Sequence, residues 1–227
     1  SFLIAFAIVA AVSPATVQAA PAAPVNLWFN GWKATNFSSY SFDFKLKQYV
    51  DGVEIIKTYG DNVYEALRYE PDDGMSAGTW TFTSKKQPTN RVMMVYARAF
   101  RYNSNWNRVY SAWSKPCGII PWAKKGSVKI TVPNSRKAAV KVSWSKIAYS
   151  SGYNVMIATN PKGKWYFAKS GVTSTSATIS SCNGSKLKTY KNYYVRVITR
   201  KKYSGKVYSA PAPSTGYYSN RFYLYTY

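Results

Sequence analysis

The feature that most constrains the fold of this chain is an internal repeat, in which the two halves match at a fixed offset of 98 residues. The matched segments are residues 98–100 with 196–198, 109–112 with 207–210, and 42–46 with 140–144. All of these pairs share one register without a gap. The matched segments include two alternating strands and a hairpin. Their shared register predicts two duplicated units, one in each half of the chain.

Each unit has the pattern of an all-β fold. Apolar residues alternate with period two, and clusters of Gly, Pro, Asn and Ser separate the alternating runs. In the second unit the alternation predicts seven strands, near residues 127–132, 139–146, 152–158, 164–169, 175–180, 192–200 and 205–211. Seven short strands divided by turn signals predict a small antiparallel sandwich of two sheets.

Three aromatic motifs stand in order along the second unit: Val140-x-Val142-x-Trp144, then Gly152-Tyr153-x-Val155, then Leu187 followed by Tyr193-x-Val195-x-Val197. With these motifs the unit resembles a fibronectin type III domain of the kind found in exported bacterial proteins. The resemblance implies that Trp144, Tyr153 and Leu187 are structural core residues. It also implies that Tyr193 makes a corner hydrogen bond to the backbone upstream. Most members of this family are scaffolds and spacers, so binding or architecture is implied rather than catalysis.

The first unit looks like a divergent copy, because Val95 occupies the position of the corner tyrosine and residues 53–73 are longer and more acidic than their counterparts. We therefore expect two tandem seven-stranded immunoglobulin-like (fibronectin type III) sandwiches. The predicted organisation is a signal peptide at 1–19, a first domain at 24–116, a linker at 117–126, a second domain at 127–213 and an aromatic tail at 214–227.

Residues 2–12 form an apolar run of 11 residues, which is too short to cross a bilayer but suits the core of a signal peptide. Val17 and Ala19 fit a cleavage site, so the mature chain is expected to begin near Ala20. The alternative is a short membrane anchor or a buried helix. No later run is apolar enough to cross a membrane, and we expect a secreted protein associated with the cell surface.

Charge is segregated along the chain. All eight acidic residues precede Cys117, whereas 19 of the 31 Lys and Arg residues follow it, so the front half carries about +4 and the back half +19. A unit without carboxylates cannot neutralise its cations by internal salt bridges, so its field is screened by salt or met by an anionic partner. The sequence therefore predicts an anionic partner for the second unit.

The same composition argues against catalysis. The chain has no His, and its basic half has no carboxylate that could act as general base or hard-metal ligand. Asp72 and Asp73 have no His or metal-ligand companion and are better explained as turn residues. No P-loop and no zinc-ligand spacing is present. We expect a protein that is not an enzyme and that uses no cofactor or metal.

Candidate binding residues cluster near the end of the second unit. If Tyr193, Val195 and Val197 point inward, the residues between them lie on the outer face of the same sheet. The predicted polyanion-binding residues are Arg196, Arg200, Lys201, Lys202, Lys206 and Lys164, and the predicted stacking residues are Tyr194, Trp165 and Tyr203. Cations interleaved with aromatic rings suit an anionic glycan or wall polymer, and nucleic acid only non-specifically. The alternative is an ordinary solvated hairpin.

The C-terminal tail has high β propensity, because Tyr223, Tyr225 and Tyr227 alternate after Phe222. It is expected to add a strand to its own sheet. The alternative is strand addition to a neighbouring subunit, which would make the protein a self-associating fibre or matrix component.

The only cysteines are Cys117, at the junction of the two units, and Cys182, which follows the fifth strand of the second unit. If the units are joined end to end, the two sulfur atoms lie too far apart for a bond. We predict no intrachain disulfide.

Overall fold

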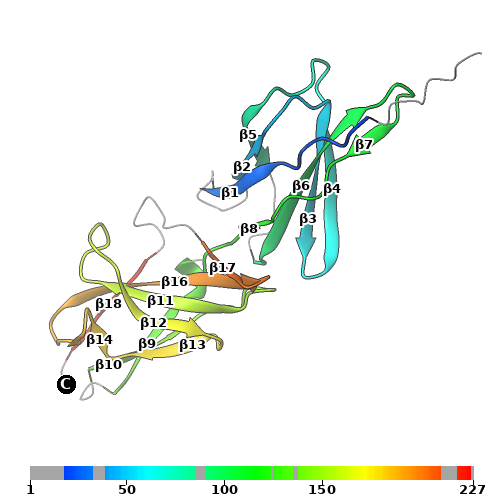
Figure 1. Ribbon diagram of the computed structural model, residues 1–227. Coiled ribbons are helices and arrows are strands. Elements are labelled where there is room, and N and C mark those ends of the chain that lie inside the picture. The colour runs from blue at the N-terminus through cyan, green and yellow to red at the C-terminus, as the bar shows by residue number, and fades with distance from the viewer. Residues whose placement is uncertain are drawn as a thin grey trace, which may run out of the picture.

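The computed structural model describes residues 18–32, 39–84, 90–123, 125–134, 138–210 and 219–225. These residues form two β-sandwiches joined end to end (Figure 1). The described part of the chain contains strands and one 3-10 turn, η1 (Lys125–Ser127). Across these same residues no helix is long and apolar enough to span a membrane. Residues 1–17 of the predicted signal peptide lie outside the described residues.

The first unit packs a three-stranded sheet against a five-stranded one. The smaller sheet has the order β1 (Val25–Trp32), β2 (Tyr40–Leu46), β5 (Gly78–Ser84). The larger has the order β4 (Asn62–Tyr69), β3 (Gly52–Tyr59), β6 (Met93–Tyr102), β7 (Arg108–Tyr110), with β8 (Cys117–Ile119) also paired to β6. The alternating side chains Tyr40, Phe42 and Phe44 are buried between the sheets, and the removal of their apolar surface from water stabilises the fold.

The second unit repeats this arrangement. Its smaller sheet has the order β13 (Ser176–Ile179), β10 (Ala139–Ser143), β9 (Lys129–Asn134). The larger has the order β12 (Tyr166–Val172), β11 (Gly152–Ala158), β16 (Asn192–Tyr203), β17 (Lys206–Ser209), with β18 (Asn220–Tyr223) also paired to β16. A short hairpin joins β14 (Ser181–Cys182) and β15 (Ser185–Lys186). The prediction of two tandem all-β sandwiches is confirmed. The two packed sheets of each unit hold eight strands in place of the expected seven, because β8 or β18 joins the larger sheet.

The core of the second unit contains the aromatic residues singled out in the sequence. Trp144, Tyr153, Leu187 and Tyr193 are all buried there. The rings of Trp144 and Tyr153 meet edge to face at 5.2 Å. The Tyr193 hydroxyl accepts a hydrogen bond of 2.9 Å from the backbone N–H of Lys188, five residues upstream, and so ties the chain before β16 to the strand itself.

The segment expected to be a linker is instead buried. Residues 117–123 are all buried. Strand β8 completes the first unit, and Trp122 pairs with Ile198 of β16 in the second. The reason is the composition of the segment, CGIIPWA, which has no charged residue. Burial of its apolar side chains stabilises the folded state. The chain therefore passes from one core directly into the next.

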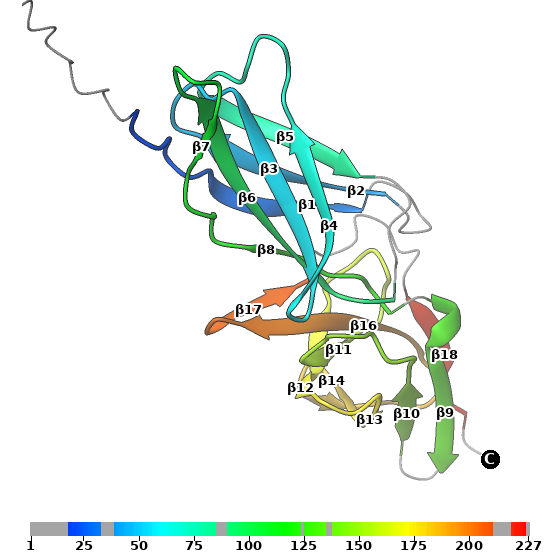
Figure 2. The same ribbon diagram turned by 90° about the vertical axis from the view of Figure 1, so that its right-hand side faces the viewer.

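The two units lie against each other at one end of each (Figure 2), and hydrogen bonds fix them in place. The Tyr96 hydroxyl donates a hydrogen bond of 2.7 Å to the Tyr203 hydroxyl, and the Tyr208 hydroxyl donates one of 3.2 Å to the carbonyl of Pro116. The backbone N–H of Val92 donates to the carbonyl of Ala148 at 2.9 Å. The junction between the two sandwiches thus consists of the buried segment 117–123 together with these hydrogen bonds.

The C-terminal tail adds a strand to its own sheet, the arrangement that the sequence analysis favoured. Strand β18 pairs antiparallel with the first residues of β16, and the Phe222 ring stacks on Tyr193 at 5.5 Å. Phe222 is therefore a core residue and not an exposed assembly contact, because its ring fills the end of the sandwich. Tyr223 is half-buried and Tyr225 is exposed, while Tyr227 lies outside the described residues.

Both cysteines are free thiols in separate sandwiches. Cys117 is buried in the first core, where burial raises the pKa of its thiol to about 12, and Cys182 is half-buried against the second core. Because the thiolate is the reactive form, a thiol reagent such as DTNB is expected to modify Cys182 in the folded protein and Cys117 only after unfolding. A Cys182→Ser variant that is still modified rapidly when folded would contradict this assignment.

Candidate functional site

The outer face of the larger sheet of the second unit carries the side chains predicted to bind a partner. In β16 the residues Tyr193, Val195 and Val197 point into the core. The alternation of a strand then places Arg196 and Arg200 on the opposite face, as the sequence analysis assigned them. This face is formed by β12, β11 and β16.

Arg196 lies on that face but is covered, and only 8 % of it is exposed. Its guanidinium carbon is 4.1 Å from the ring centre of Trp165 and 5.7 Å from that of Trp122. The sequence analysis placed Arg196 on this face but did not predict its burial. Strand alternation predicts on which face of a sheet a side chain lies. It does not predict that Trp122 and Trp165, which lie outside the strands of this sheet, cover that face. We call Arg196 with Trp122 and Trp165 the arginine slot.

The charge in the arginine slot has no anionic neighbour among the described residues. Nη2 of Arg196 contacts the sulfur of Met156 at 3.7 Å, and Nε is buried without a hydrogen-bond partner in the described structure. Burial lowers the pKa of the Arg196 guanidinium to about 10, so the group is still charged at neutral pH. A cation held this way gains some stabilisation from the faces of the indoles but keeps unused hydrogen-bonding capacity.

The first unit contains the same arrangement of an arginine beside two aromatic rings, and here a carboxylate pairs with the arginine. Arg98, which precedes Arg196 by the repeat offset, lies 3.8 Å from the ring centre of Tyr110 and 4.6 Å from that of Trp113. The Glu54 carboxylate accepts hydrogen bonds from its Nε at 2.9 Å and its Nη2 at 2.6 Å. Glu54 stands directly opposite Arg98 in the sheet.

In the second unit the corresponding residue opposite Arg196 is Met156. The thioether of Met156 therefore occupies the position that the carboxylate of Glu54 has in the first unit. Burial raises the pKa of Glu54, but hydrogen bonds from Arg98, Tyr110 and Arg68 outweigh that effect and hold the pKa below its usual value. The cluster in the first unit is thus internally neutralised, and the cluster in the second unit is not.

This contrast extends to the whole of each unit. The ion pairs among the described residues all lie in the first unit, and they join Lys57 to Glu65, Arg68 and Arg98 to Glu54, and Arg108 to Glu70. The second unit has no carboxylate side chain to offer its cations.

Two further predicted cations lie beside the arginine slot. Arg200 stands opposite Gly152, and its Nη1 lies 3.2 Å from the position that a Cβ atom on Gly171 would take. The two glycines therefore leave room for the Arg200 side chain to lie flat across β11 and over β12. Lys202 follows on the same face of β16 and is exposed.

The other cations of the hairpin face the opposite way. Lys201 stands opposite Tyr208, and the Lys206 ammonium lies 5.0 Å from the centre of the Tyr208 ring. On this side the Tyr203 hydroxyl accepts the hydrogen bond from Tyr96 of the first unit, which places Tyr203 at the junction of the two units. The hairpin thus divides its charge between the sheet face and the junction of the units, because neighbouring residues of a strand point to opposite sides.

The remaining side chains around the slot complete a basic and aromatic face. Lys164 lies 5.4 Å from the centre of the Tyr166 ring, and Tyr194 is half-buried on β16. Phe167, which is 63 % exposed, and Lys169 were not predicted. Their alternation along β12 was the available signal, because both project outward from the same strand.

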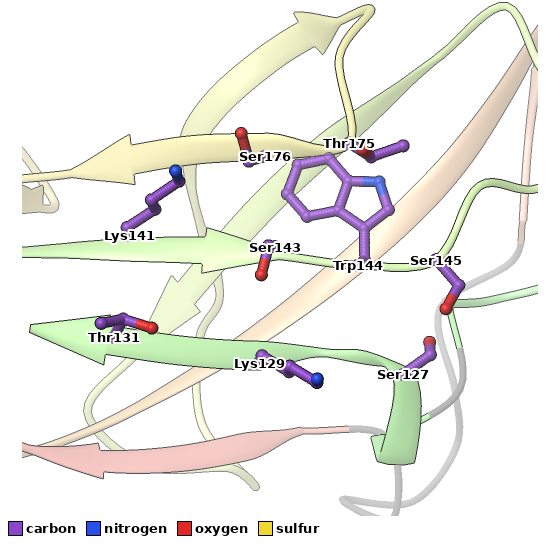
Figure 3. Close-up of a pocket in the computed structure, with 9 residues that line it drawn as sticks. All are labelled: Ser127, Lys129, Thr131, Lys141, Ser143, Trp144, Ser145, Thr175 and Ser176. Atoms are coloured by element: carbon purple, nitrogen blue, oxygen red, sulfur yellow. The ribbon is translucent and has the colours of Figure 1, made fainter.

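A second feature is a hollow of about 570 Å³ on the smaller sheet of the same unit. Figure 3 shows Lys129 and Lys141 projecting from the neighbouring strands β9 and β10, with the Trp144 indole beside them. The rest of the lining consists of hydroxyl side chains, from Ser127, Thr131, Ser143, Ser145, Thr175 and Ser176. The indole N–H of Trp144 is buried and has no hydrogen-bond partner in the described structure. Within the described ranges, no group of His, Cys, Asp or Glu could hold a metal ion.

Comparisons with known proteins concern the fold. No protein-family model and no curated protein matches the chain. Among solved structures, the FN1–FN3 domains of chicken CNTN1 are 14% identical, with 92% of this chain and 70% of that chain covered and a TM-score of 0.35. A segment of two fibronectin type III domains from chicken tenascin is 13% identical, with 88% and 99% covered and a TM-score of 0.38. The strand order and register of the chain itself show two tandem antiparallel β-sandwiches.

Proposed function

We propose that this is an exported, non-catalytic binding or adhesion protein whose basic second unit contacts an anionic polymer at the cell surface or in the extracellular matrix. The observation that carries the proposal is the arginine slot, a charged side chain that the fold holds between two indoles without a carboxylate. Export is supported by the apolar run at residues 2–12 and by a fold that is common in extracellular binding modules.

The face around the slot suits a polymer better than a small ion. Arg200, Lys202 and Lys169 extend the positive charge along the sheet, and Phe167 and Trp165 offer flat surfaces among them. Charged groups attract the repeated anions of a chain, while aromatic faces stack on its sugar rings. Several weak contacts in a row then add up to useful affinity.

Binding of the full chain to an anionic polymer is expected to weaken at least about tenfold between 50 and 200 mM salt, because counterions compete with each contact. The measurement is a titration with polygalacturonate, dextran sulfate and polyphosphate at both salt concentrations, with uncharged dextran as the control. If the protein binds none of the three at low salt, or binds dextran equally well, the proposed function is wrong.

The face responsible is tested by removing charge at two places. Arg200→Gln combined with Lys202→Gln is expected to weaken polymer binding by about five- to tenfold, because it removes two contacts beside the slot. The matched control is Lys146→Gln combined with Lys188→Gln, which removes the same charge from exposed residues outside the strands. Equal losses in the two variants would show that net charge alone, and not this face, determines binding.

A further inference from the structure

The two halves of the repeat differ at one position in a way that identifies a ligand group. Glu54 neutralises Arg98 in the first unit, and Met156 occupies the corresponding position opposite Arg196 in the second. We propose that the arginine slot binds a carboxylate of an acidic polysaccharide, which takes the place beside Arg196 that the Glu54 carboxylate holds beside Arg98. This inference rests on the proposed function and specifies its ligand.

The first unit supplies the geometry of the bound group. There one carboxylate oxygen accepts from both Nε and Nη2 of Arg98, at 2.9 and 2.6 Å. Among the described residues of the second unit, Nε of Arg196 has no hydrogen-bond partner and Nη2 contacts only the sulfur of Met156, which is a weak acceptor. This edge of the guanidinium keeps its hydrogen-bonding capacity but is buried, so an acceptor from outside the chain reaches it when the Met156 or Trp165 side chain moves aside.

The surroundings of that edge favour a carboxylate over a phosphate or a sulfate. A carboxylate is planar and matches the fork of a single guanidinium. The nearest neighbours of the Arg196 guanidinium, Met156 and the rings of Trp122 and Trp165, are largely apolar. A tetrahedral oxyanion would bring additional charged oxygens into this place, where they would lose water without gaining donors.

The indoles also fit the rest of a uronic acid. In such a sugar the carboxylate is attached directly to the ring, so a group that enters the slot brings an apolar ring face against Trp165, which is half-buried and borders the open face. The next acidic sugars of the chain then lie over Arg200 and Lys202. A polymer with one carboxylate per sugar, such as polygalacturonate, matches this row of cations.

The test is to supply the missing carboxylate from within the protein. Met156→Glu is expected to recreate in the second unit the pairing that Glu54 makes with Arg98, and so to lower affinity for polygalacturonate at least about tenfold. Met156→Gln has nearly the same size and no charge, and it is expected to bind within about twofold of the wild type. The readout is the dissociation constant of the full-length variants, with circular dichroism to verify folding.

A second control separates the effect of a carboxylate in the arginine slot from the effect of a lower net charge. Ser185→Glu adds the same charge at an exposed residue of β15, a hairpin outside both sheets, and is expected to reduce affinity by no more than about threefold. Met156→Glu and Ser185→Glu variants with equal affinity would overturn the inference. In that case salt-dependent binding by the wild type would still support the proposed function.

The chemical class is tested by the same polymer panel. Wild-type protein that binds dextran sulfate or polyphosphate more tightly than polygalacturonate, at equal charge, would overturn the choice of carboxylate. If Met156→Glu does not fold, Arg196→Gln provides the second variant. It keeps a flat polar group between the indoles and is expected to abolish the preference for polygalacturonate over dextran sulfate. A preference that persists in this variant contradicts the inference.

Discussion

Replacing Trp122 with alanine is expected to destabilise the second unit by about 4 kcal/mol, the typical cost of removing a large aromatic side chain from a core. Only 2 % of Trp122 is exposed, and it packs into the core of the second unit although it stands in the segment that joins the two units. It also pairs with Ile198 in the middle of β16. The substitution therefore weakens both the core of the second unit and the contact of residue 122 with β16.

The measurement is differential scanning calorimetry of the full chain. The transition of the second unit is expected to fall by roughly 15 °C, well separated from that of the first unit. Trp106→Ala is the matched control, because Trp106 is 80 % exposed at a turn of the first unit and its replacement should change stability by no more than about 0.5 kcal/mol. Equal effects of the two substitutions would mean that residues 117–123 act as a simple linker.

Trp122 also illustrates what the sequence did not reveal. Period-two alternation located seven strands of the second unit, β9 to β13, β16 and β17, because the order of side chains along a strand shows directly which residues face inward and which face outward. It carried no information on residues 117–123, which do not alternate. Their uninterrupted apolar composition was the available signal for burial, but it does not say that one part completes the first unit while Trp122 enters the second.

The candidate site was predicted only in part for a related reason. Alternation placed Arg196 on the correct face, but it could not show that two indoles distant in sequence cover the side chain. Trp165 was selected as a stacking residue and Trp122 was not. The relation between Glu54 and Met156 emerges only from the pairing of strands, because the residues opposite an arginine are set by the register of two sheets and not by the repeat offset.

The two units therefore share one architecture and differ in how their charge is met. In the first, Glu54 holds two arginines and a tyrosine hydroxyl in one cluster. In the second, the comparable arginine contacts two indole rings and the thioether of Met156. A duplicated sandwich can keep its shape while one copy loses its internal anions, because packing rather than ion pairing supplies most of its stability. The copy without anions then presents its charge to a partner.

The first unit also contains the most deeply buried charge among the described residues, and Glu65→Gln is expected to destabilise that unit by about 3 kcal/mol. The side chain of Lys57 is 0 % exposed, and its ammonium lies 5.7 Å from the ring centre of Tyr40 and 5.5 Å from that of Phe82. Its charged partner is Glu65, opposite it on β4, and the Ser84 hydroxyl lies at 3.1 Å. Without the carboxylate, the ammonium would remain in the core with neutral neighbours only.

Removing the other partner should cost less. Lys57→Met keeps an unbranched apolar side chain between the rings, and the Glu65 side chain, which is 33% exposed, can turn toward water, so a loss of about 1 kcal/mol is expected. The double variant should resemble Lys57→Met alone, because the glutamate has no buried charge left to satisfy. Urea unfolding of the three variants checks this order. If Lys57→Met is as damaging as Glu65→Gln, the methylene packing of the lysine matters more than its charge, and the buried ion pair is not what requires Glu65.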